Sequence, residues 1–143
     1  MTVVFVCTGN TCRSPMAAAL MRDALHRREQ SAAVLSAGLS ADGSPAADNA
    51  VAVLAEWGLD LSRHRSRQLT PDLLAAADHL VVMTPDQGRL LAAAGAAPEK
   101  IRVLGNGIPD PYGGDTAVYR RTRDTLREAV EALLDEWFPE ATP

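Results

Sequence analysis

Residues 3–17 read VVFVCTGNTCRSPMA: an apolar run, a loop framed by Cys7 and Arg13, and the start of a helical pattern. The apolar run predicts a buried strand, and Ser14 followed by Pro15 predicts a helix with Ser14 as its N-cap. A loop between a strand and a helix N-terminus can turn its backbone N–H groups inward, which makes it a cradle for an anion. The same field stabilises a thiolate at Cys7, and the planar fork of Arg13 matches two oxygens of a phosphoryl group.

Strand and helix patterns alternate along the rest of the chain. We expect further strands at 33–37, 79–83 and 101–104, and helices at 14–29, 45–57, 71–77, 85–94 and 115–137. This alternation predicts an α/β fold with a parallel sheet and helices on both faces. Four strands in the flavodoxin-like order 2-1-3-4 satisfy the right-handed crossover rule. Ligands of such sheets bind beyond the carboxyl ends of the strands, where the Cys7 loop lies.

Length and charge exclude several classes of protein. The 143 residues suit one domain spanning 1–143, and the net charge of −4 argues against a general nucleic-acid binder. No apolar run approaches the roughly 20 residues that span a bilayer, so we expect no membrane partner. Two cysteines and no targeting pattern favour a reducing cytoplasm. We also expect a monomer. No cluster of His, Asp and Glu has the spacing of metal ligands, and no cofactor or metal is expected.

The Cys7 loop with its flanks resembles the start of the low-molecular-weight protein phosphatases, cysteine-dependent enzymes with a C-x5-R loop. Three further segments resemble the same family: SAG at 36–38, HRSRQ at 64–68 and DPYGG at 110–114. The resemblance runs from about residue 2 to residue 137. It implies metal-independent hydrolysis of phosphorylated proteins through a cysteinyl-phosphate intermediate, with inorganic phosphate or other oxyanions binding at the loop.

The resemblance also assigns roles to residues. Cys7 is the expected nucleophile, and Asp110 is the expected general acid, although an Asp-Pro pair alone would indicate only a turn. The hydroxyl of Ser14 is expected to donate a hydrogen bond to the Cys7 thiolate. Asn10 tolerates left-handed backbone angles, and the resemblance connects it to Ser36 and His64. The expected phosphate-binding loop comprises Thr8, Gly9, Asn10, Thr11, Cys12, Arg13 and Ser14.

Two positions bear on the substrate. Tyrosine-directed members of the family usually have an aliphatic residue at the position of Thr11 and two aromatic residues after Asp-Pro. This chain has Thr11, then Tyr112 followed by Gly113, which is closer to the bacterial protein-arginine-phosphatase branch. A threonine oxygen can accept a hydrogen bond from a guanidinium N–H, which an aliphatic residue cannot. The sequence therefore favours phosphoarginine slightly over phosphotyrosine.

Three alternatives stay open. An arsenate reductase of this family would need further cysteines after the third strand, and residues 82–88 contain none. A phosphoprotein-binding module would be expected to lose Cys7 or Asp110, and both are present. A redox sensor could use a reversible bond between Cys7 and Cys12, because a reactive thiolate oxidises readily; Cys12 could equally be a small packed side chain.

Overall fold

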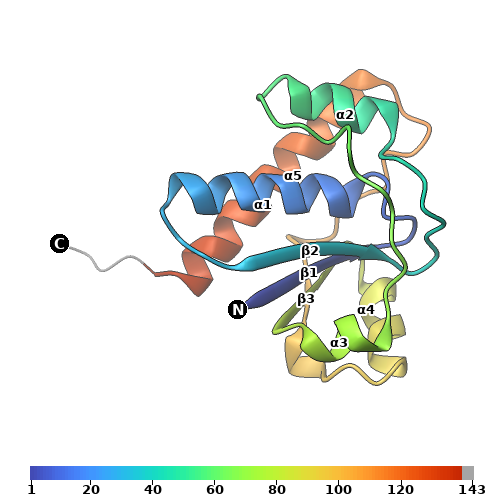
Figure 1. Ribbon diagram of the computed structural model, residues 1–143, viewed down its shortest axis with the longest axis vertical. Helices are drawn as coiled ribbons and strands as arrows, with labels where there is room; N and C mark the ends of the chain where they lie inside the picture. Colours follow the sequence, from blue (N-terminus) through green and yellow to red (C-terminus); the bar gives the residue numbers. More distant parts are fainter. Residues whose placement is uncertain (140–143) are drawn as a thin grey trace.

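The structure is a computed structural model that describes residues 1–139. It confirms the α/β class and the strand order, β2-β1-β3-β4, all parallel. Figure 1 shows α1, α2 and α5 on one face of the sheet and α3 and α4 on the other. The elements are β1 (Thr2–Cys7), α1 (Arg13–Arg27), β2 (Ala33–Gly38), α2 (Asp48–Ala55), α3 (Pro71–Ala76), β3 (His79–Val82), α4 (Pro85–Ala93), a 3-10 turn (Pro98–Lys100), β4 (Ile101–Val103) and α5 (Thr116–Trp137).

The central strand β1 is buried on both faces. Its residues 3–6 have no exposed surface. Val3 and Phe5 pack into the cluster beneath α1 and α5, whereas Val4 and Val6 pack into the cluster on the side of α4. Successive side chains of a strand point to opposite faces, so a strand covered on both sides needs a continuous apolar run. Burial of each large side chain contributes about 1.5–3 kcal/mol before conformational entropy is counted.

The carboxyl end of β1 is held closely by β2. Cys7 is in register with Gly38, and Leu39 N donates to Cys7 O at 3.0 Å. A Cβ atom at Gly38 would lie 2.8 Å from Thr8 O and 3.0 Å from Asn10 Cβ. The absence of a side chain at Gly38 therefore lets the loop after β1 lie directly against β2.

Two helix starts differ from the sequence prediction. The prediction of Ser14 as an N-cap is wrong: α1 begins at Arg13, and its N-cap, Cys12, makes no side-chain capping bond. Helix α2 begins at Asp48 rather than at residue 45, because Pro45 forms an antiparallel bridge with Arg65. The other predicted boundaries agree with the structure to within two residues.

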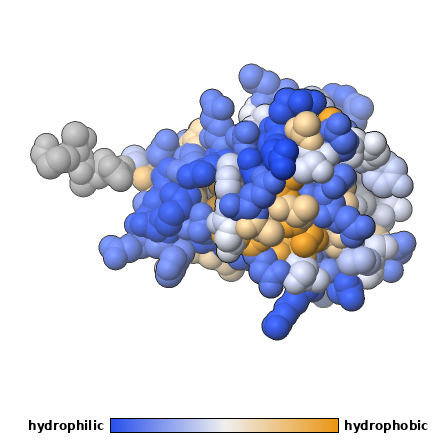
Figure 2. Space-filling view, turned by 90° about the horizontal axis from the view of Figure 1, so that it is seen from above, coloured by the Kyte–Doolittle hydropathy of each residue, from blue (hydrophilic) through white to orange (hydrophobic). Residues whose placement is uncertain are grey.

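One face of the molecule is mostly polar. Figure 2 shows a face on which hydrophilic side chains predominate and apolar ones gather in one small area. Among the residues that the structure describes, no helix is both long enough and apolar enough to cross a membrane.

Candidate active site

The loop from Cys7 to Ser14 brings a thiol and a hydroxyl together. Cys7 Sγ lies 2.9 Å from Ser14 Oγ, and Asn10 Nδ2 donates to the same Oγ at 2.7 Å. Since Ser14 Oγ accepts from Asn10, its own hydrogen is available to the sulfur. The expected contact between Ser14 and Cys7 is thus present, and it is oriented to stabilise a thiolate.

Asn10 holds the loop in shape from a strained backbone position. Its φ of 56° lies in the left-handed region, as the sequence suggested. Its Oδ1 accepts from Arg67 N at 3.0 Å, and its carbonyl oxygen lies 2.7 Å from His64 Nε2. A carbonyl only accepts, so Nε2 of His64 carries a hydrogen. Burial lowers the pKa of His64 below its ordinary 6.5, with Arg22 and Arg65 acting in the same direction.

The other expected supporting residue, Ser36, is not bonded to Asn10. Ser36 is buried in β2 opposite Phe5. Within residues 1–139 no hydrogen bond joins its hydroxyl to Asn10, whose amide instead reaches Ser14 and Arg67. The side-chain oxygen of Asn10 is thus bonded to the backbone N–H of Arg67, a contact that sequence patterns could not have shown.

Arg13 and Asp110 meet across the cavity. The Arg13 side chain is buried, and its Nη1 donates to Ile108 O at 2.9 Å. Its Nη2 lies 3.7 Å from Asp110 Oδ2. The Asp110 side chain is 55% exposed, and its Oδ1 accepts from Tyr112 N at 3.0 Å. The guanidinium is thus fixed in orientation, while the carboxyl group stays open to solvent and to a substrate.

Cys12 contacts a tyrosine of the last helix, α5. Both Cys7 and Cys12 are free thiols, and Cys12 Sγ lies 3.2 Å from the hydroxyl of Tyr119 on α5. Burial and this contact raise the pKa of Tyr119 above its ordinary value of 10, so the hydroxyl stays protonated. Cys12 is packed in this structure, and a reversible bond to Cys7 stays a prediction.

These groups surround a cavity of about 180 Å³. Its mouth has one large aromatic side chain, Tyr112, which is 81% exposed. The lining residues are Cys7, Thr8, Gly9, Thr11, Cys12, Arg13, Asp110 and Tyr112. The structure therefore gathers the predicted nucleophile, arginine, acid and both specificity residues around one space.

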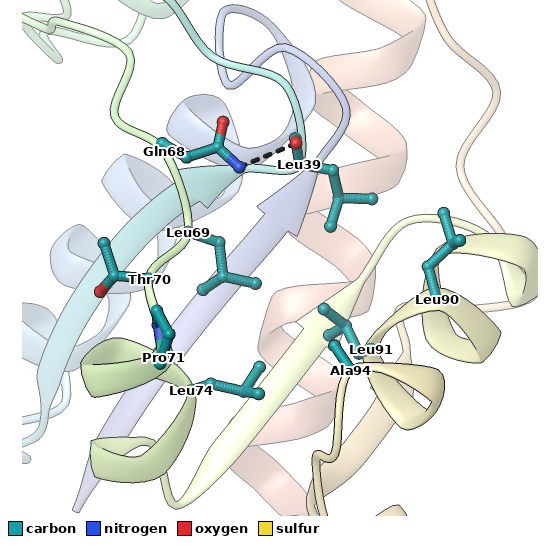
Figure 3. Close-up of a pocket in the computed structure, with 9 residues that line it drawn as sticks. All are labelled: Leu39, Gln68, Leu69, Thr70, Pro71, Leu74, Leu90, Leu91 and Ala94. Atoms are coloured by element: carbon teal, nitrogen blue, oxygen red, sulfur yellow. Dashed lines mark hydrogen bonds between the residues drawn. The ribbon is translucent and has the colours of Figure 1, made fainter.

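A second cavity, of about 260 Å³, lies between α3 and α4. Figure 3 shows leucine side chains from the segment after β2, from α3 and from α4 turned toward one another around it. Gln68 lies at its edge and donates to Leu39 O at 2.8 Å. This cavity is lined mainly by aliphatic side chains and carries no ionisable group.

Besides the Arg67 contact, sequence reasoning missed three contacts of the loop. These are the Ile108 carbonyl on Arg13, the Tyr119 hydroxyl on Cys12 and the Gln87 amide on Thr8. Only Gln87 carried a local signal, because Thr84 and Gln87 match a capping box at the start of α4. In residues 1–139 no three His, Cys, Asp or Glu side chains are placed to hold a metal ion together.

Comparison with known families decides the assignment. Residues 2–141 match the profile of the low molecular weight phosphotyrosine protein phosphatases. The chain belongs to this family. The protein-arginine-phosphatase of Bacillus subtilis is 37% identical over 145 residues, covering 95% of this chain and 96% of that protein. The probable low molecular weight protein-tyrosine-phosphatase EpsP of Ralstonia nicotianae is 36% identical, with 96% and 94% covered.

Solved structures of the family have the same fold. The YwlE arginine phosphatase, in a cysteine-to-serine mutant with a phosphorylated active site serine, superposes with a TM-score of 0.92 at 35% identity, covering 98% of this chain and 97% of that one. The tyrosine phosphatase Wzb from Escherichia coli K30, in complex with sulphate, gives 0.86 at 27% identity, with 95% and 97% covered. Oxyanion binding is thus found within the family.

Arsenate reductases are also relatives. Arsenate reductase 1 of Staphylococcus epidermidis is 32% identical over 133 residues, covering 92% of this chain and 94% of that protein. The reductase alternative therefore comes from the same family, although residues 82–88 of this chain contain no cysteine.

Proposed function

We propose that this chain is a cytoplasmic, monomeric, single-domain protein phosphatase that acts through Cys7 and favours phosphoarginine over phosphotyrosine. The observation that carries the proposal is the cavity that joins the Cys7 thiol, the buried Arg13 fork and the open Asp110 carboxyl. The Ser14 hydroxyl at 2.9 Å from the sulfur supports a thiolate there. Membership of a phosphatase family gives the reaction class.

In the first step, Cys7 Sγ attacks phosphorus, and the bond from phosphorus to the leaving nitrogen or oxygen breaks. The loop N–H groups and Arg13 hold the phosphoryl oxygens as charge redistributes, which is the main source of rate in phosphoryl transfer. Asp110 gives its proton to the leaving atom. The product of this step is a cysteinyl-phosphate.

In the second step, water attacks the phosphorus of that intermediate. The S–P bond breaks, the water proton passes to Asp110, and inorganic phosphate leaves. The thiolate returns to its contact with Ser14. Dividing one displacement into two is the usual advantage of covalent catalysis. The exposed carboxyl of Asp110 suits both roles, because it can reach a leaving group and then a water molecule.

The preference for arginine rests on Thr11, Tyr112 and Asp110. Thr11 lines the cavity with an oxygen that can accept from a guanidinium N–H. One exposed aromatic side chain, Tyr112, offers less apolar wall to a phenol than two would. The protonated Asp110 carboxyl group can accept a hydrogen bond from a guanidinium N–H and give its proton to the leaving nitrogen. A site with a hydrogen-bonding group for its substrate can discriminate strongly against an analogue that leaves that group unpaired.

The decisive experiment measures kcat/KM on matched phosphoarginine and phosphotyrosine peptides for the wild type and for Thr11→Ile. We expect the wild type to prefer phosphoarginine. Thr11→Ile removes the acceptor and adds apolar surface, and should shift the preference toward phosphotyrosine by about tenfold. Thr11→Ser, which keeps the oxygen, is the matched control. A wild type that clearly prefers phosphotyrosine contradicts the arginine assignment but not the phosphatase assignment.

A further inference from the structure

Gln87, near the start of α4, connects that helix to the phosphate-binding loop. The residue is buried, and its Oε1 accepts from Met83 N at 2.8 Å and from Thr84 N at 3.2 Å. Its backbone N–H donates to Thr84 Oγ1 at 3.3 Å, which completes a capping box. Its Nε2 donates to Thr8 Oγ1 at 3.3 Å.

These contacts fix the direction of the bond to Thr8. Two backbone N–H groups occupy Oε1 of Gln87, so a flipped amide would place its own N–H₂ against two donors. The amide nitrogen must therefore face Thr8, and Thr8 Oγ1 must accept from it. A hydroxyl that accepts this bond keeps its hydrogen for a different acceptor.

Thr8 stands at the mouth of the cavity rather than on its floor. It lines the same space as Cys7 and Arg13, but it is exposed whereas they are buried. The part of a substrate beside Thr8 is thus the part beyond the phosphoryl group. In a polypeptide, the acceptors found at every residue are the main-chain carbonyl oxygens.

We propose that Gln87 is a positioning residue that makes Thr8 a hydrogen-bond donor to a main-chain carbonyl of the polypeptide substrate. This inference rests on the proposed function of the site. It gives the enzyme a means of preferring a phosphorylated residue within a chain over a small free phosphate ester. Neither α4 nor Gln87 has to touch the substrate for this to hold.

The test compares equilibrium binding of two non-hydrolysable ligands by calorimetry: phenylphosphonate and a peptide containing phosphonomethyl-phenylalanine. Thr8→Val keeps the side-chain shape and removes the hydroxyl. We expect it to weaken peptide binding about threefold to tenfold more than phenylphosphonate binding. Thr8→Ser, which keeps the hydroxyl, should restore most of the difference.

Gln87→Glu tests the polarity of the bond. Glutamate also suits this capping position, but its carboxylate only accepts, so the Thr8 hydroxyl would turn to donate to it and offer lone pairs to the substrate. The added charge should weaken binding of both anions, whereas the reversed hydroxyl should weaken the peptide further. In the Thr8→Val background only the effect of charge should remain, with no added change in the ratio of the two affinities.

Two results would overturn the inference. One is a ratio of affinities that Thr8→Val leaves unchanged. The other is an equal shift of that ratio by Gln87→Glu in both backgrounds, which would mean that Gln87 does not act through Thr8. Melting temperatures check that each variant folds. Because the readout is binding, the two proposals can fail separately. If the variants change the affinity ratio as expected but the wild type hydrolyses neither phenyl phosphate nor phosphopeptides, only the phosphatase proposal is contradicted.

Discussion

The loop from Cys7 to Ser14 and the loop from Ile108 to Gly114 face the same cavity but are held in different ways. In the first, Asn10, Arg13 and Ser14 are buried. Asn10 and Arg13 are bonded to the backbone of residues far along the chain, and Ser14 joins Cys7 to Asn10 within the loop. In the second, Asp110 and Tyr112 are largely exposed, and Asp110 is held by the backbone of Tyr112 itself. The loop proposed to hold the phosphoryl group is thus pre-organised, and the loop proposed to meet the leaving group is open.

The largest effect should come from the fixed loop. Cys7→Ser replaces a thiolate with a hydroxyl, which is a far weaker nucleophile at neutral pH. We expect turnover of phenyl phosphate to fall by a factor on the order of 10⁵–10⁶, as when other covalent enzymes lose their nucleophile. Cys12→Ser is the matched control, with a much smaller loss. Substantial activity in Cys7→Ser, or loss of wild-type activity in EDTA, would contradict the mechanism.

In the open loop, Asp110→Asn should act on chemistry rather than on folding. The side chain is exposed, so the free energy of unfolding should change by about 0.5 kcal/mol or less. Loss of the proton donor should slow esters with poor leaving groups about 100-fold or more, and esters with good leaving groups far less. Initial rates on a series of aryl phosphates test this. Equal loss across the series would assign Asp110 to binding instead.

Stability should separate the two loops directly. Asn10→Ala removes a buried amide that bonds Ser14 and Arg67, at a cost of about 1–3 kcal/mol in the free energy of unfolding. Tyr112→Ala, at an exposed position, should cost about 0.5 kcal/mol or less while raising KM. Urea denaturation of both variants measures the difference. Similar losses in the two would show that the second loop is also a structural support.

The smallest effect concerns pH and His64 behind the fixed loop. Burial lowers its pKa below 6.5, so the unfolded chain takes up a proton more readily than the folded one. This contribution to stability is complete above pH 6.5 and is lost as the pH falls through the folded value. His64→Gln keeps a donor at Nε2 without the charge, and it should melt closer to the wild type at pH 5.5 than at pH 8.

The sequence alone predicted the fold and the position of the Cys7 loop, but it did not predict the distant residues that contact this loop. The strand order and the place of Cys7 followed from the alternation of elements and from one apolar run, because a central parallel strand must be buried on both faces. Asp110 needed the family resemblance, since Asp-Pro alone is only a turn. The Ile108 carbonyl and the Tyr119 hydroxyl had no local signal: their contacts with the loop join residues 95 and 107 positions apart.

The prediction of Ser14 as an N-cap failed for a related reason, although its predicted contact with Cys7 is present. Serine before proline at a helix start is typical of an N-cap, and local preference pointed to that role. In the structure, the hydroxyl instead joins Cys7 and Asn10, and α1 begins one residue earlier. The site thus uses a residue whose local preference is for capping, which is where sequence rules are expected to fail.

The close approach at Gly38 has a consequence for reading genetic variation in this protein. A methyl group there would push against the carbonyl of Thr8 and the side chain of Asn10, and the backbone cannot yield without moving Cys7, the proposed nucleophile. In a screen scored by activity, Gly38→Ala would be indistinguishable from damage to the chemistry, although Gly38 does not line the cavity. Counting every position at which substitution abolishes activity would therefore overstate the number of residues that take part in the reaction. A folding assay run in parallel would separate substitutions that disturb the structure from those that remove a reacting group.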